Sequence, residues 1–135
     1  MDKTIEVPLR AQEDVVRVRQ LTRTHAVAIG LSLVDQTKFV TAASELARNT
    51  LVHGGGGTML LELLEEAGKT GIRLTFEDRG PGIRDIEKAL QDGYTTGNGL
   101  GLGLGGAKRL ASHFAIQSTP GEGTRVVITQ WSRKG

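Results

Sequence analysis

The stretch Glu45-Leu-Ala-Arg-Asn49 carries a carboxylate and an amide four residues apart. If this stretch is helical, both side chains lie on one face of the helix, one turn apart. Both are hard oxygen donors, and Mg²⁺ in proteins usually takes one or two such ligands and completes its shell with phosphate oxygens and water. The spacing therefore suits a magnesium–phosphate site, although an ordinary solvent-facing helix can carry the same pair.

A second carboxylate, Asp78, ends an apolar run and is followed by Arg-Gly-Pro-Gly. An ionised carboxylate only accepts hydrogen bonds, so at the end of a strand it can take the exocyclic amine of adenine. Gly80 and Gly82 would let the backbone approach a flat base closely. The alternative interpretation of this segment is an ordinary turn containing Asp and Gly.

Glycine is concentrated between Gly97 and Lys108, where six of the twelve residues are glycine. The segment Gly101–Gly106 spells G-x-G-x-x-G, but turn-like residues precede it and no acidic residue follows at the end of a second strand. A dinucleotide fingerprint is therefore excluded, and a P-loop is excluded because no Ser or Thr follows Lys108. What remains is either a merely mobile loop or a glycine loop leading into a helix, whose free N–H groups favour an anion such as phosphate.

The elements that must position these residues follow from apolar periodicity and turn residues. The pattern predicts a strand at 4–10, helices at 13–30 and 35–53, strands at 58–67 and 71–78 joined by the turn 68–71, a short helix at 84–93, a helix at 106–114, and two strands within 115–131. Pro8 favours an edge position for the first strand. Hairpin-paired strands with inserted helices indicate an α+β fold, a two-layer α/β sandwich whose mixed, mostly antiparallel sheet has its helices on one face.

Composition narrows the class of protein. A length of 135 residues suggests one domain, residues 1–135. The sequence contains no cysteine, which excludes disulfides and Cys-based zinc sites. Without an apolar N-terminal segment or a run of about 18 apolar residues, we expect a cytoplasmic protein with no membrane partner. A formal net charge of +2 gives no support for a nucleic-acid partner.

Four segments in order read E-x-x-x-N, D-x-G-x-G, a glycine-rich stretch, and G-x-G-T at Gly121–Thr124. Together they resemble the ATP-binding domain shared by gyrase, Hsp90 chaperones, histidine kinases and MutL, the GHKL or Bergerat fold. Within that group, "DQTKFVTAASELARNTLVHGGGG", "EDRGPGI", "DGYTTGNGLGLGL", "GAKRL" and "GEGT" are most similar to the RsbT-like serine/threonine-protein kinases that regulate sigma factors. The resemblance covers about residues 5–131.

The resemblance implies a role for each matched residue. Asn49 would hold the Mg²⁺ that bridges the ATP phosphates, and Glu45 would be the general base that accepts the hydroxyl proton of a substrate Ser or Thr. Asp78 would bind adenine above a pocket floor formed by Gly80 and Gly82, and Thr124 would support Asp78 or the adenine through a hydrogen bond. A lid around the triphosphate would be formed by Gly99, Gly101, Gly103 and Gly105.

The resemblance also implies a function. The chain would be a switch-type kinase that phosphorylates a STAS-domain protein in a stressosome-like partner-switching pathway, then activates a PP2C-type phosphatase or another output enzyme. Two alternatives stay open: an anti-sigma factor that sequesters a sigma subunit, and an adaptor whose nucleotide site only stabilises its fold. Glu45 argues against the adaptor, because a purely structural site needs no base. Arg48, His53 and Lys108 are expected to serve a surface salt bridge, a helix end and a solvated face.

Overall fold

The computed structural model describes residues 4–83, 85–90 and 103–132 of the chain. In chain order the elements are β1 (Thr4–Leu9), α1 (Gln12–Ala28), α2 (Leu33–Val52), β2 (Gly57–Glu66), β3 (Lys69–Asp78), α3 (Ile86–Ala89), α4 (Gly103–Leu110), β4 (His113–Thr119) and β5 (Gly123–Trp131). This order agrees with the predicted one, and the boundaries of the long helices differ by one or two residues. None of the described helices combines the length and the apolar character needed to cross a membrane.

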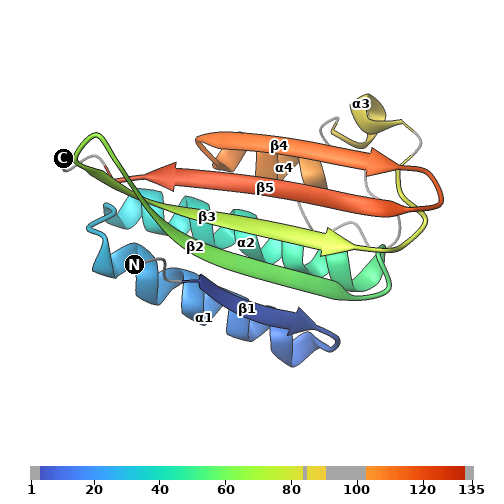
Figure 1. Ribbon diagram of the computed structural model, residues 1–135, viewed down its shortest axis with the longest axis horizontal. Coiled ribbons are helices and arrows are strands. Elements are labelled where there is room, and N and C mark those ends of the chain that lie inside the picture. Colours follow the sequence, from blue (N-terminus) through green and yellow to red (C-terminus); the bar gives the residue numbers. More distant parts are fainter. Residues whose placement is uncertain (1–3, 84, 91–102, 133–135) are drawn as a thin grey trace.

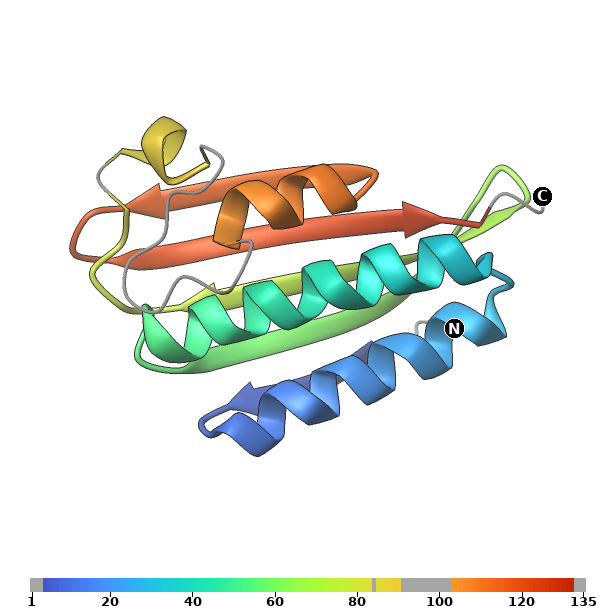
Figure 2. The same cartoon turned by 180° about the vertical axis from the view of Figure 1, so that it is seen from behind.

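The strands form one sheet in the order β1-β2-β3-β5-β4. Helices α1, α2 and α4 cover one face of it, as Figures 1 and 2 show from opposite sides. The predicted α+β two-layer sandwich is therefore confirmed, and Pro8 lies in an edge strand as expected. Every pairing among the described strands is antiparallel, so the parallel pair that a mixed sheet would contain is not found among them.

The core lies between the sheet and the helices, because each element turns one apolar face inward. Buried residues of α1 recur at helical spacing: Val15, Val18, Thr22 and Ala26. On the sheet, alternate residues of β2 and β3 are fully buried, and they include Met59, Leu61, Ile72 and Leu74. Burial of one face of each strand fixes the register, since a slip by one residue would expose the whole apolar set.

The hairpin between β2 and β3 is confirmed, but its loop begins one residue earlier than predicted and contains two residues where four were expected. The loop consists of Ala67 and Gly68, which have φ values of 53° and 80°. Two successive residues with positive φ are typical of the tight turn that matches the twist of paired strands. Gly71, which the prediction places where the turn meets the strand 71–78, lies buried in β3 beneath the ring of Trp131, and Lys69 and Thr70 also belong to β3.

The helix predicted at 106–114 is shifted. Helix α4 begins at Gly103 and ends at Leu110, and β4 already begins at His113. From His113 onward the side chains alternate between exposed and half-buried, with Phe114 and Ile116 packed against the core. The alternating stretch is so short that the sequence does not distinguish it from the end of a helix.

Candidate functional site

Asp78 lies at the end of the buried face of β3. The inward-facing residues before it, Ile72, Leu74 and Phe76, are apolar and buried, and Asp78 continues the same alternation into a half-buried position. The strand register sets Gly57 of β2 opposite Asp78 on one side and Thr124 of β5 on the other. A half-buried carboxylate therefore follows the apolar row at the end of the strand.

The row that contains Asp78 crosses the whole sheet. Leu9, Gly57, Asp78, Thr124 and Ser118 are successive cross-strand partners from β1 to β4. Leu9 is fully buried beneath the helices. Because residues in one cross-strand row point to the same face of a sheet, the polar side chains of this row lie on the helical side.

Two glycines make room for the carboxylate of Asp78. A Cβ atom at Gly54 would collide with that carboxylate, and one at Gly80 would lie 2.8 Å from the Cα and carbonyl oxygen of Gly54. The N–H of Gly80 donates a hydrogen bond of 2.9 Å to Oδ1 of Asp78. The backbone around this carboxylate is thus packed as closely as glycine allows.

The loop after Asp78 is fastened to the turn between β4 and β5. The N–H of Gly121 donates to the carbonyl of Pro81 at 2.7 Å. The N–H of Ile83 donates to Oγ of Ser118, also at 2.7 Å. At Gly82, φ is 75° and a Cβ would collide with the carbonyl of Thr119. The D-x-G-x-G and G-x-G-T segments, about 40 residues apart in sequence, therefore form one unit in space.

Helix α2 carries Glu45 and Asn49 to the same end of the sheet. Its first turn is capped by Ser32, whose Oγ accepts from the N–H of Asp35 at 3.1 Å. Glu45 and Asn49 are both half-buried, at the border of the helix face that packs on the sheet. The carbonyl of Asn49 accepts from the N–H of Gly54 at 3.1 Å, and Gly54 in turn contacts Asp78. The two carboxylates and the amide therefore belong to one region of the molecule.

The lid role predicted for four glycines stays a prediction, but two of these glycines lie in a helix. Gly103 and Gly105 lie in helix α4 and not in an open loop, and Gly105 is buried. Helix α4 packs against α2, and a run of small buried residues lets the two helices approach closely: Gly105, Gly106 and Ala107. Gly99 and Gly101 lie outside the described residues.

Of the two partners predicted for Thr124, Asp78 is not the one observed, and a hydrogen bond to adenine stays a prediction. Its hydroxyl lies 2.8 Å from Oγ of Ser118, and no hydrogen bond joins it to Asp78 among the described residues. Ser118 belongs to no motif recognised in the sequence, and its place becomes visible only when β4 is paired with β5.

Of the residues without a firm role, Arg48 and Lys108 are exposed, and His53 ends α2 with its N–H bonded to the carbonyl of Asn49.

Comparison with known families places this fold and site in a class. Residues 34–134 match the family described as histidine kinase-, DNA gyrase B-, and HSP90-like ATPases. The match spans most of the chain, and the chain belongs to this family.

Individual relatives show which members of this ATPase family the chain is similar to. The serine/threonine-protein kinase RsbT of Bacillus subtilis (strain 168) is 43% identical over 127 residues, which cover 94% of this chain and 96% of RsbT. The anti-sigma F factor of Thermoanaerobacter sp. (strain X514) is 30% identical over 118 residues, which cover 84% of this chain and 82% of that protein. The predicted resemblance to RsbT-like serine/threonine kinases is confirmed.

A solved structure agrees with the fold. The crystal structure of the RsbU and RsbW domains of Rv1364c from Mycobacterium tuberculosis superposes with a TM-score of 0.66 at 21% identity, and it covers 98% of this chain. This chain spans 34% of that longer chain. At such low identity the likeness supports the architecture alone.

Proposed function

We propose that this chain is a switch-type protein serine/threonine kinase that transfers the γ-phosphoryl group of ATP to a partner protein. The observation that carries the proposal is the placement of Glu45 and Asn49 on one border of α2, next to the close-packed glycines around Asp78. Membership of an ATPase family and 43% identity to a serine/threonine kinase support it.

The donors present fit a magnesium–nucleotide complex. Within the described residues, no group of three or more His, Cys, Asp or Glu side chains is arranged to hold a metal ion alone. A metal ion at Asn49 would therefore depend on phosphate oxygens and water for most of its shell, which is how Mg²⁺ is commonly bound beside nucleotides. When bound, Mg-ATP supplies the phosphoryl group and the charge neutralisation at the phosphates.

The chain's own residues then have separate tasks. One oxygen of Asp78 already accepts from Gly80, so the carboxylate is held in place and can accept from the exocyclic amine of adenine. Asn49 would orient the metal-bound phosphates, and Glu45, one turn away on α2, would accept the proton of the attacking hydroxyl. Gly54, Gly80 and Gly82 let the backbone pack closely around Asp78, where a Cβ atom would collide with neighbouring atoms.

The partner we propose is a STAS-domain protein in a stressosome-like pathway. Phosphorylation would add negative charge to the contact surface of the partner and weaken its hold on the kinase. The released kinase would then bind and activate a PP2C-type phosphatase or another output enzyme. This sequence of events is the partner switch, and we expect it to take place in the cytoplasm.

The first test measures phosphoryl transfer directly. The chain is mixed with γ-labelled ATP, Mg²⁺ and a STAS-domain protein, and label is followed on Ser or Thr of the partner. Glu45→Ala should slow transfer by about 10²–10⁴-fold, the usual contribution of a positioned base, while ATP affinity measured by calorimetry stays the same. Transfer at the normal rate in Glu45→Ala would contradict the assigned base.

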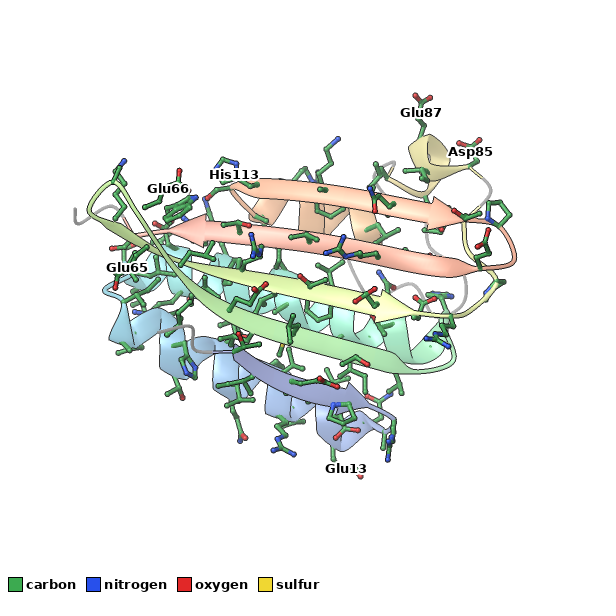
Figure 3. All side chains as sticks on the ribbon, in the orientation of Figure 1. Glu13, Glu65, Glu66, Asp85, Glu87 and His113 are labelled. Carbon is green, nitrogen blue, oxygen red and sulfur yellow. The ribbon has the colours of Figure 1, made fainter. Side chains whose placement is uncertain are left out.

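The matched control is Glu66→Ala. Glu66 is exposed on the β2–β3 hairpin, and Figure 3 shows it at the opposite end of the sheet from Asp85 and Glu87 of the segment that follows β3. This variant removes a carboxylate without touching the site, so both transfer and binding should be unchanged. Equal losses in Glu45→Ala and Glu66→Ala would indicate a general charge effect.

A second function is favoured by the anti-sigma F relatives. A chain of this family could sequester a sigma subunit, with phosphorylation of an antagonist as the release step. Size-exclusion chromatography with purified sigma subunits separates the two proposals. A stable 1:1 complex with a sigma subunit, dissolved by the STAS-domain protein, would favour the anti-sigma function over activation of an output enzyme.

A further inference from the structure

Ser118 lies on the edge strand β4, at the end of the cross-strand row that contains Asp78 and Thr124. It is the penultimate residue of β4, half-buried, and its side chain points to the helical face together with Phe114 and Ile116. Phe114 and Ile116 pack against the core, whereas the third inward position carries a hydroxyl. A polar residue at this place on an otherwise apolar strand face requires partners for its hydrogen bonds.

The hydroxyl of Ser118 joins three segments of the chain. It accepts from the N–H of Ile83 at 2.7 Å, lies 2.8 Å from the hydroxyl of Thr124, and donates toward the carbonyl of Gly123 at 3.1 Å. Ile83 belongs to the loop that follows Asp78, and Thr124 is the cross-strand neighbour of Asp78. One side chain therefore fixes both segments that border this carboxylate.

The number of hydrogen bonds that the Ser118 hydroxyl can make determines whether the Thr124 hydroxyl donates or accepts. A serine has one proton to donate and two lone pairs, and the N–H of Ile83 uses one lone pair. If the serine proton goes to Thr124, the proton of Thr124 is free to be donated to a ligand. If it goes to Gly123, Thr124 must donate to Ser118 and can only accept from a ligand. Ser118 thus sets whether Thr124 acts as donor or acceptor beside Asp78.

Recognition of adenine requires the first arrangement, in which Ser118 donates its proton to Thr124. Adenine presents an exocyclic amine, which donates, beside a ring nitrogen, which accepts. Asp78 can only accept and so matches the amine, which leaves the neighbouring Thr124 to match the acceptor by donating. We propose that Ser118 is a positioning residue for nucleotide recognition, which directs the Thr124 hydroxyl and holds the loop to Ile83, and so contributes to the selection of adenine. This inference rests on the proposed function.

Calorimetric affinities for ATP and for inosine triphosphate, whose base carries a carbonyl oxygen in place of the amine, test the proposal. Ser118→Ala should weaken ATP binding by about tenfold, as expected for lost hydrogen bonds, and inosine triphosphate binding by less, so that the ratio of the two affinities falls. Ser118→Thr keeps the hydroxyl and should restore the ratio. The turnover number for phosphoryl transfer at saturating ATP should not change.

Ser112→Ala is the matched control. Ser112 directly precedes β4, and its hydroxyl donates a hydrogen bond to the side-chain carbonyl of Gln130 on β5. This contact lies at the opposite end of the β4–β5 pair from Ser118. Both alanine variants should lower the thermal midpoint of the nucleotide-free protein, and only Ser118→Ala should change the affinity ratio. Unchanged ATP affinity in Ser118→Ala, or equal losses for both nucleotides, would overturn the role of Ser118 while leaving the kinase proposal intact. If the unaltered chain binds neither nucleotide, the proposed function fails and this inference fails with it.

Discussion

At the scale of single residues, Gly54 is the glycine whose Cβ would meet the carboxylate group of Asp78 itself. Its φ needs no glycine, but any Cβ there would collide with Asp78. Gly54→Ala should therefore displace the carboxylate and weaken ATP binding by about 10- to 100-fold, because a hydrogen bond to a charged group is worth roughly 1.5–3 kcal/mol. Isothermal titration calorimetry with Mg-ATP measures the effect.

Gly71→Ala provides the control for this variant. Gly71 also has an ordinary φ, and a Cβ there would lie 2.7 Å from the ring of Trp131, at the other end of β3. Both substitutions crowd a side chain, so both should lower the thermal midpoint. Only Gly54→Ala should reduce nucleotide affinity, and equal affinities for the two variants would show that Asp78 tolerates the added methyl group.

Sequence reasoning located Asp78 and its glycines but missed Gly54 and Ser118. Asp78 could be predicted because the alternation of β3 and the glycines that follow it are local signals. The role of Gly54 depends on how closely α2 approaches the end of β3, and the role of Ser118 depends on the pairing of β4 with β5. Neither contact leaves a trace in the neighbouring sequence. The run of glycines at 54–57 contributes to the family resemblance, but the sequence does not show that Gly54 lies against Asp78.

At the scale of elements, the start of α1 depends on one carboxylate. Asp14 accepts from the N–H of Arg10 at 2.9 Å and from the N–H of Ala11 at 3.0 Å. These backbone hydrogen bonds, that of Arg10 first, lower the pKa of Asp14 below its ordinary 3.8. The ionised carboxylate also interacts favourably with the positive end of the helix dipole. Asp14→Ala should therefore lower the thermal midpoint at neutral pH.

The carboxylate of Asp14 makes the stability of the fold depend on pH, and the lowered pKa determines the direction of this dependence. A lowered pKa in the folded state means that the contribution of Asp14 to stability is complete above the unfolded-state pKa and is lost as pH falls through the lower folded-state pKa. Thermal melts of the parent chain and of Asp14→Ala should differ at pH 6–7 and converge as the pH falls below about 3.8. A difference that persisted undiminished at low pH would mean that the carboxylate charge is not what stabilises α1.

Element types were easier to predict from the sequence than element limits. The long helices and the β2–β3 hairpin have strong periodicities, and both were predicted. The start of α4 was not, because the glycines at 103 and 105 suggest a loop before the predicted helix, while packing against α2 favours small residues in a helix. Tertiary contact overrode intrinsic propensity there.

At the scale of the whole molecule, the candidate site and the single tryptophan lie at opposite ends of the sheet. Trp131, the single tryptophan of the chain, is the last residue of β5, and Thr124 is near the first. Trp131 lies seven positions after Thr124 along the strand, which is about 23 Å at the usual rise per residue. Trp131 packs over Gly71 and lies far from Asp78. Its fluorescence should therefore respond to the unfolding of the sheet and not to occupancy of the site.

This separation allows a test of ligand binding that does not depend on catalysis. A ligand that binds only the folded state stabilises it by about 2.7 kcal/mol at a concentration 100 times its Kd, so saturating Mg-ATP should raise the midpoint of the tryptophan melt by several degrees. At a fixed temperature well below the midpoint, the emission spectrum of Trp131 should not change when Mg-ATP is added. Asp78→Asn should lose most of the midpoint shift, because the single amide oxygen would accept from the N–H of Gly80 and the NH2 group, a donor, would then face the adenine amine. A melt unaffected by Mg-ATP in the unaltered chain would contradict nucleotide binding at this end of the sheet, since tight binding must stabilise the state that binds.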